Sequence, residues 1–215
     1  MNSEILIRQF TQNDRADVRR MSCQTAFLGS PFKNFIDDEE ILADALTSYY
    51  TDYEPESCFV AVSNEKVVGY IIGSKDVTGM SKALQSKIIF SIIKKLVRRG
   101  VFFKKNTLKF FFRVLFSAVK GEFFAPNFSR EYPATLHVNI DERFRGQQVG
   151  SRLIAHYLNF LKINKIQGVH FGTLSEKAKD FFIKSGFSLL FEGRRSYLRD
   201  HLGKSVHFYI FGKKI

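Results

Sequence analysis

The sequence contains no tryptophan and only two cysteines among its 215 residues. Cys23 and Cys58 stand in unrelated contexts and form no CxxC pair, so neither a disulfide framework nor a metal site is indicated. No apolar stretch reaches the roughly 20 uncharged residues that a membrane-spanning helix needs. Residues 1–10 carry charges and lack the apolar core of a signal peptide. We therefore expect a cytoplasmic protein that binds no metal.

The composition predicts one folded domain. Apolar residues make up 45% of the chain, which is enough for a hydrophobic core, and the length fits one domain of ordinary size. The chain contains no internal repeat and no low-complexity tract. We predict a single domain over residues 1–215, with a helical insertion at about residues 80–130.

Acidic residues are missing from residues 81–120, although the whole chain has a net charge of +12. This segment holds eleven Lys or Arg and seven Phe. The eleven basic residues nearly account for the excess of positive charge. A basic protein favours anionic partners, such as a phosphorylated cofactor, nucleic acid or an acidic membrane surface.

Apolar residues in the insertion recur at helical spacing. The first set is Leu84, Ile88, Ile92 and Leu96, and the second, after Gly100, is Leu108, Phe111, Phe112, Leu115 and Val119. This spacing predicts two amphipathic helices with basic outer faces, and it favours a helical hairpin whose Phe face is buried. Contact of residues 81–120 with a membrane or nucleic acid, or a lid over an acidic acceptor, stays open as an alternative.

The remaining patterns alternate between strands and helices. The predicted strands cover residues 4–10, 58–62, 67–73, 134–141, 169–172, 187–191 and 206–211. The predicted helices cover residues 14–27, 37–49, 150–163 and 175–184. The order is β-α-α-β-β-insertion-β-α-β-α-β-β, so we expect an α/β (α+β) domain with a mixed sheet covered by helices.

Residues 141–154 form the most informative stretch, in which a strand runs into a glycine-containing loop and the loop into a helix. At a helix start several backbone N–H groups lack partners and the dipole is positive, so such an end binds a diphosphate. Gly146 and Gly150 allow close backbone approach, and Arg145 and Arg152 add positive charge. The alternative is an ordinary connection whose glycines serve only the turn.

A second stretch, residues 175–187, strengthens the first interpretation. Together the two resemble the cofactor loop (Arg/Gln-x-x-Gly-x-Gly) and the later Asn-x-x-Ala-x-x-Phe-Tyr-x-x-x-Gly-Phe segment of the GCN5-related N-acetyltransferases (GNATs). The resemblance is strong over about residues 134–190, covers only element order in residues 4–73, and offers no counterpart to residues 81–130 in the minimal fold. It implies a mostly antiparallel central sheet flanked by helices.

The resemblance also implies a function. Acetyl-CoA would be the co-substrate, and its acetyl group would pass to an amine acceptor, a small molecule or a peptide, by direct attack on the thioester. A homodimer is compatible with this interpretation. The implied cofactor-binding residues are Val138, Asn139, Ile140, Arg145, Gly146, Gln147, Gln148, Val149, Gly150, Ser151, Ser175, Ala178 and Phe181.

Three residues depart from the family pattern. Gln148 stands where the family's middle Gly usually sits, and Ser175 replaces the usual Asn. Phe182 stands at the position of a Tyr that is thought to protonate the departing thiolate, and Phe has no proton to give. Water or another group must then act, or catalysis is weak, or the protein is a catalytically inactive acyl-CoA-binding module. A basic nucleic-acid or membrane-binding protein is the remaining alternative.

A base is needed because a free alkyl amine has a pKa of about 10 and is mostly protonated at neutral pH. His137, on the strand before the loop, is the candidate, since His titrates near neutrality. The alternative for His137 is a histidine packed in the sheet. Asp141 and His170 are the other candidates, and a backbone N–H near Ile140 would receive the carbonyl oxygen.

Overall fold

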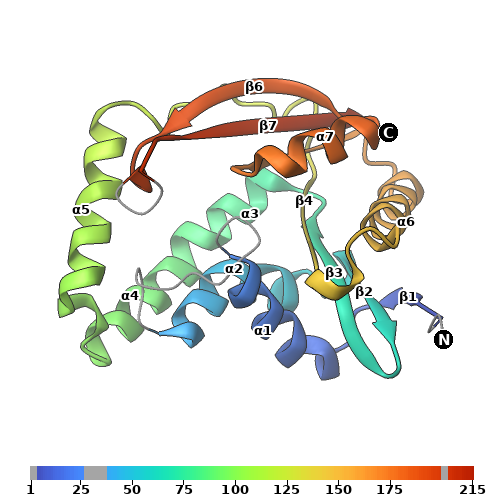
Figure 1. Cartoon of the computed structure of the whole chain (residues 1–215), viewed down its shortest axis with the longest axis horizontal. Coiled ribbons are helices and arrows are strands. Elements are labelled where there is room, and N and C mark those ends of the chain that lie inside the picture. Colours follow the sequence, from blue (N-terminus) through green and yellow to red (C-terminus); the bar gives the residue numbers. More distant parts are fainter. Residues whose placement is uncertain (1–3, 27–37, 200–202) are drawn as a thin grey trace.

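The computed structural model describes residues 4–26, 38–199 and 203–215. The predicted helix ends at Phe27 and Asp37 lie outside the described residues. Figure 1 shows two groups of strands with helices beside and between them. The strands are β1 (Leu6–Gln9), β2 (Cys58–Ser63), β3 (Lys66–Ser74), β4 (Thr135–Ile140), β5 (Gly168–Thr173), β6 (Ser188–Arg195) and β7 (Val206–Lys214). The helices are α1 (Arg15–Thr25), α2 (Glu39–Tyr53), α3 (Val77–Ala83), α4 (Ile89–Arg98), α5 (Lys105–Val119), α6 (Val149–Ile163) and α7 (Glu176–Lys184).

The sheet consists of two antiparallel halves. One half has the order β1-β2-β3-β4 and the other has the order β5-β7-β6. A single parallel bridge between Ala134 and Val169 joins them. The β2–β3 hairpin turns at Asn64 and Glu65, both with positive φ, which is the turn geometry that matches the twist of paired strands. The predicted element order and mixed sheet are confirmed.

Each face of the sheet has its own core. On one face α6 buries Leu153 and Tyr157 against Phe59, Ile71 and their neighbours. On the other face Val18 and Met21 of α1 pack against a cluster that contains Tyr70 and Ile72 of β3. Because strand side chains alternate between faces, residues of β4 also divide between these two cores.

The insertion is helical, but its predicted packing is wrong. Helices α4 and α5 meet at an angle in Figure 1 and do not form a hairpin. The α4 helix packs on α2, where Leu96 contacts Ile41 and the Lys95 ammonium lies 2.5 Å from the Asp44 carboxylate. The α5 helix instead reaches the far end of the β6–β7 pair. Much of the Phe-rich face, including Phe112 and Phe116, is exposed and not buried.

Candidate functional site

The two halves of the sheet separate between β4 and β5. His170 N–H donates to the Ala134 carbonyl at 2.9 Å, and Ala134 N–H donates to the Gly168 carbonyl at 3.1 Å. Backbone direction alternates along a strand, so Val138 and Ile140 present their N–H and carbonyl groups on the same side as Ala134. Among the described residues no strand pairs with them there. The carboxyl end of β4 is therefore an open edge inside the molecule.

Asn139 differs from its two neighbours. Asp141 N–H donates to the Val68 carbonyl of β3 at 2.9 Å. Because backbone direction alternates along a strand, the backbone of Asn139, two residues earlier, also faces β3 and not the open edge. The sequence predicts that Val138, Asn139 and Ile140 all offer backbone groups to one ligand. In the structure only Val138 and Ile140 are oriented toward the open edge.

The loop after β4 begins with a short 3₁₀ turn, Glu142–Phe144. The Asp141 carboxylate holds this turn by accepting from Arg143 N–H at 3.0 Å and from the Arg143 guanidinium at 2.7 Å. Gly146 and Gln148 then take left-handed conformations, with φ of 80° and 60°. Left-handed backbone favours glycine, which explains physically why a glycine belongs at position 148.

Helix α6 starts with a cluster of free donors. Its first helical hydrogen bond runs from Arg152 N–H to the Gln148 carbonyl at 3.0 Å. Within the described ranges, the backbone N–H groups of Gly146, Gln148, Val149, Gly150 and Ser151 donate to no protein acceptor. These groups stand at the positive end of the α6 dipole, directly after the open edge of β4. This is the arrangement that binds phosphate oxygens.

Three side chains of the loop take other partners. Gln147 donates to the Arg143 carbonyl at 3.1 Å, and Arg145 donates through Nε to the Ile140 carbonyl at 3.4 Å. Arg145 therefore stays at the open edge. Arg152 donates to the Ile5 carbonyl at 2.8 Å, so its guanidinium holds the segment before β1, whereas the sequence placed it at the anion site.

Helix α7 packs against this loop. Ser175 caps the helix, because its hydroxyl accepts from Ala178 N–H at 3.3 Å, and Ser thus fills the role of the family's Asn. A methyl group on Gly150 would lie 3.2 Å from the Phe181 ring. Gly150 therefore lets the start of α6 approach Phe181.

Phe182 lies in the core. Its ring centroid is 4.4 Å from that of Phe171 and 5.8 Å from that of Phe211, and only 5% of its surface is exposed. An apolar ring in this place cannot donate a proton.

His137 belongs to a partly buried polar chain that sequence reasoning missed. The Asn139 amide donates to the Tyr70 hydroxyl at 2.7 Å and lies 3.0 Å from His137 Nε2. Burial lowers the pKa of His137 to about 4, so its imidazole is neutral at pH 7. Tyr70 is completely buried, and this burial raises its pKa. The sequence carries no local signal for this chain, because the register of β3 and β4 sets Tyr70 opposite Asn139.

The two other base candidates are already engaged. A hydrogen bond from Arg143 lowers the pKa of Asp141, which therefore stays ionised and paired. His170 donates through Nδ1 to the Tyr132 carbonyl at 2.6 Å, and burial lowers its pKa.

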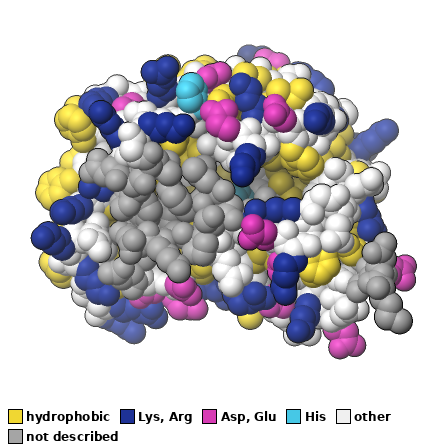
Figure 2. Space-filling view, viewed as in Figure 1, with side chains coloured by type: hydrophobic (Ala, Val, Ile, Leu, Met, Phe, Trp, Pro, Cys, Tyr) yellow, Lys and Arg dark blue, Asp and Glu magenta, His cyan; other side chains and the backbone are white. Residues whose placement is uncertain are grey.

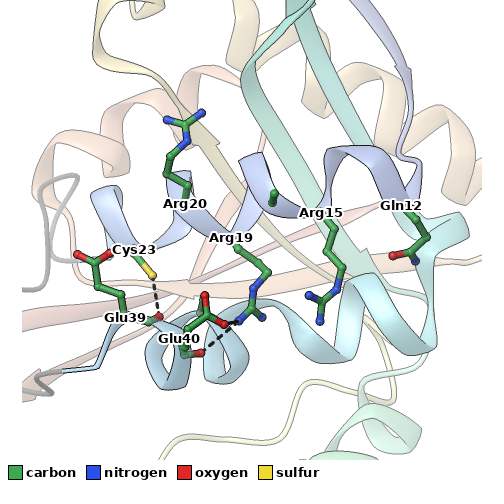
Figure 3. A pocket seen from close by; sticks show the side chains of 9 residues that line it. Gln12, Arg15, Arg19, Arg20, Cys23, Glu39 and Glu40 are labelled. Carbon is green, nitrogen blue, oxygen red and sulfur yellow. Dashed lines mark hydrogen bonds and ion pairs between the residues drawn. The ribbon is translucent and has the colours of Figure 1, made fainter.

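A surface hollow of about 480 Å³ lies between α1 and α2, on the opposite face of the sheet from α6 (Figure 3). Each of its three arginines is paired with a carboxylate. Arg15 pairs with Asp52 at 2.8 Å and Arg20 with Asp17 at 2.7 Å. The Arg19 guanidinium lies 2.7 Å from the Glu40 carboxylate and 2.8 Å from that of Asp44. Cys23 donates to the Glu39 carbonyl at 3.4 Å. Because these groups satisfy one another, the hollow does not compete with the α6 loop as an anion site. The part of the chain that the structure describes contains no cluster of metal ligands.

No profile of a known protein family matches the sequence. Solved structures match the fold over nearly the whole length of both chains. SsHAT has a TM-score of 0.69 at 18% identity and covers 98% of each chain. The polyamine N-acetyltransferase of Drosophila melanogaster, which forms N-acetylagmatine, has a TM-score of 0.58 at 16% identity, with 99% of this chain and 100% of that chain covered. A GNAT-family acetyltransferase from Streptococcus pneumoniae has a TM-score of 0.55 at 17% identity, with 99% of each chain covered.

These matches define the class of fold. The similarity extends over nearly the whole chain, and at 16–18% identity it concerns the fold. The chain has the fold of the GCN5-related N-acetyltransferases.

Proposed function

We propose that the protein is an acyl-CoA-dependent N-acyltransferase, which moves an acetyl group from acetyl-CoA to an amine by direct attack on the thioester. One observation carries the proposal. The backbone N–H groups of Gly146 and of residues 148–151, which have no acceptor within the described part of the chain, gather at the start of α6 beside the open edge of β4. Such a site has the donors that a diphosphate requires.

The residues fit coenzyme A in three places. The N–H groups of residues 146–151 would hold the diphosphate, and Arg145 adds charge at the open edge. The backbone of Val138 and the N–H of Ile140 face the open edge and would bond the amide groups of the pantetheine arm, whereas the Ile140 carbonyl already accepts from Arg145. Phe181 and Ala178 form an apolar wall on the α7 side, where both pack against the main core. Acetyl-CoA supplies the activated acyl group.

The amine must lose a proton before it attacks. An alkyl amine has a pKa of about 10, so about one in 10³ is unprotonated at neutral pH. His137 is the proposed proton acceptor. Its lowered pKa of about 4 keeps the imidazole neutral but makes it a weak base, so we expect the rate to rise with pH as the free amine becomes more abundant.

The acceptor is an amine of a small molecule or a peptide. Among the fold relatives, one acts on polyamines and another is a ribosomal-protein-alanine N-acetyltransferase from Brucella melitensis. We place the reaction in the cytoplasm, and a homodimer is compatible with it.

The cofactor site is tested by a charge at Ser151, an exposed residue in the first turn of α6. An aspartate there favours the helix dipole, so Ser151→Asp should keep or raise the stability of the free protein, by about 0.5 kcal/mol. The same charge should repel a diphosphate. We expect acetyl-CoA to raise the melting temperature of the wild type and of Ser151→Asn, whose new side chain has the shape of aspartate without its charge. Ser151→Asp should bind acetyl-CoA at least tenfold more weakly, and its melting temperature should rise less.

Equal protection of all three proteins would place the nucleotide elsewhere, and no protection of the wild type would contradict the proposal. Catalysis is tested separately by thiol release with a panel of amines. His137→Asn should lower turnover and leave acetyl-CoA protection unchanged. An unaltered rate at every pH would remove His137 from the mechanism.

A cofactor-binding module without turnover is the second candidate, and buried Phe182 favours it because no hydroxyl occupies that position. Protection by acetyl-CoA without thiol release for any amine would select this candidate.

A further inference from the structure

Helix α5 turns an apolar stripe away from the protein. Its members are Phe112, Leu115, Phe116 and Val119, which we call the outer α5 face. Their exposed fractions are 68%, 60%, 61% and 78%. The spacing i, i+3, i+4, i+7 places them on one side of the helix. A water-facing helix surface normally carries polar side chains, so this stripe needs an explanation.

The orientation of α5 is set by its inner side. Phe110 packs with Tyr197 and Leu198 at the end of the β6–β7 pair. Ser117 is fully buried and hydrogen-bonds to the Glu122 carboxylate, which also accepts from Ser196. A rotation that buried the outer α5 face would break these contacts. The contacts of the inner side of α5 therefore fix the outer α5 face toward solvent in the folded state.

Basic residues border the stripe. At 100° per residue, Lys105 and Lys109 fall beside Phe112 and Phe116 on the helix surface. The Lys120 ammonium lies 4.4 Å from the centre of the Phe116 ring. Figure 2 shows hydrophobic and Lys or Arg side chains interleaved along the edge of the molecule where Figure 1 places α5. No acidic residue occurs anywhere in residues 81–120.

Exposed aromatic residues extend the stripe at both ends of α5. Phe103 precedes the helix and Phe124 follows it, and both are strongly exposed. Helix α4 repeats the pattern with an exposed set at four-residue spacing: Ile89, Ile93 and Val97. No helix in the described ranges has the length and apolarity to cross a bilayer.

We propose that the outer α5 face docks the protein onto an anionic membrane surface, with the apolar stripe at the level of the lipid headgroups and the lysines on the phosphates. An amphipathic helix with exposed Phe and Leu and a lysine border has the chemistry for this position. The charge complementarity is with anionic lipid. The inference goes beyond acyl transfer and does not depend on it.

Two other occupants fit less well. A second copy of the chain would bring like charges together, because both faces carry lysines and neither carries an acid. The phosphates of a nucleic acid would pair with the lysines, and a base could stack on Phe112. Leu115 and Val119 offer no aromatic ring for stacking and would remain exposed to water.

Vesicle flotation of the whole protein tests the proposal without any acyl donor. We expect binding to vesicles of phosphatidylcholine with phosphatidylserine, and much weaker binding to phosphatidylcholine alone. The double variant Phe112→Ser/Phe116→Ser should lose at least tenfold in affinity. Lys105→Gln/Lys109→Gln should weaken binding mainly at low salt. The matched control is Ile163→Ser at the end of α6, where an equally exposed apolar residue (71%) lies outside the outer α5 face.

Circular dichroism and acetyl-CoA protection of each variant separate a loss of docking from a loss of fold or of the cofactor site. Three results would overturn the proposal: no binding of wild type to anionic vesicles at low salt, an equal loss in Ile163→Ser, or binding that the Phe substitutions leave unchanged. Preferential binding of single-stranded RNA would assign the face to nucleic acid. A dimer that sedimentation detects and the double variant splits would assign it to a second copy.

Discussion

Burial of His137 should make the stability of the protein depend on pH in a defined window. The pKa falls from 6.5 to about 4, which is about 2.5 units, and each unit corresponds to about 1.4 kcal/mol. Between pH 6.5 and 4, His137 is protonated in the unfolded chain but stays neutral in the folded protein, so acid favours unfolding. The free energy of unfolding should therefore fall by at most about 3.5 kcal/mol as the pH drops from 6.5 to 4.

Urea unfolding at a series of pH values between 7 and 4.5 measures this effect. Far-UV circular dichroism is the suitable signal, because the chain has no tryptophan. His137→Asn should flatten the dependence while leaving stability at pH 7 close to that of the wild type. His170, whose pKa burial also lowers, contributes in the same direction, so part of the slope should persist and disappear in the double variant.

Titration of the aspartates in ion pairs does not account for a loss of stability in this pH range. The pKa of Asp44 is lowered from 3.8. Protonation of Asp44 therefore destabilises the protein mainly at pH values below those of the experiment. The reasoning fails if His137→Asn loses as much stability between pH 6.5 and 4.5 as the wild type does.

Three further substitutions test other parts of the fold by urea unfolding. Gln148→Gly relieves a side chain held at a φ of 60° and should add about 1 kcal/mol; a loss of stability would mean that the glutamine side chain supports the loop. Gly73→Ala would force a methyl group into the Tyr157 hydroxyl and should cost about 3 kcal/mol, so wild-type stability would refute the packing. Asp44→Asn weakens the partner of the buried Arg19 guanidinium at 2.8 Å and should cost about 2 kcal/mol; no change would show that Glu40 alone suffices.

Much of the fold was predictable because local pattern decided it. Two apolar runs on either side of a short polar turn marked β2 and β3, and the spacing of Leu153, Tyr157 and Leu161 marked α6. The loop before α6 was predictable as a turn with free donors, since Gly146 and Gly150 frame the start of the helix. These features depend on neighbours along the chain, which the sequence displays directly.

The remainder depended on contacts between distant segments. The Tyr70–Asn139 hydrogen bond arises from the register of β3 and β4, and nothing near either residue announces it. Periodicity identified α5 as amphipathic but placed its apolar side inward, because a hydrophobic face alone does not reveal which surface of the fold receives it. Arg152 follows the loop closely in the sequence, which suggests a contact with the anion. Its long side chain instead reaches the Ile5 carbonyl.

The open edge of β4 has a consequence for solubility. Unpaired strand edges are templates on which other chains add strands and begin to aggregate, and most proteins blunt them with charge, proline or a bulge. Here the unpaired amides of Val138 and Ile140 lie between two halves of a sheet and not at its outer edge. These mid-sheet amides should exchange with solvent deuterium as quickly as those of a peripheral strand.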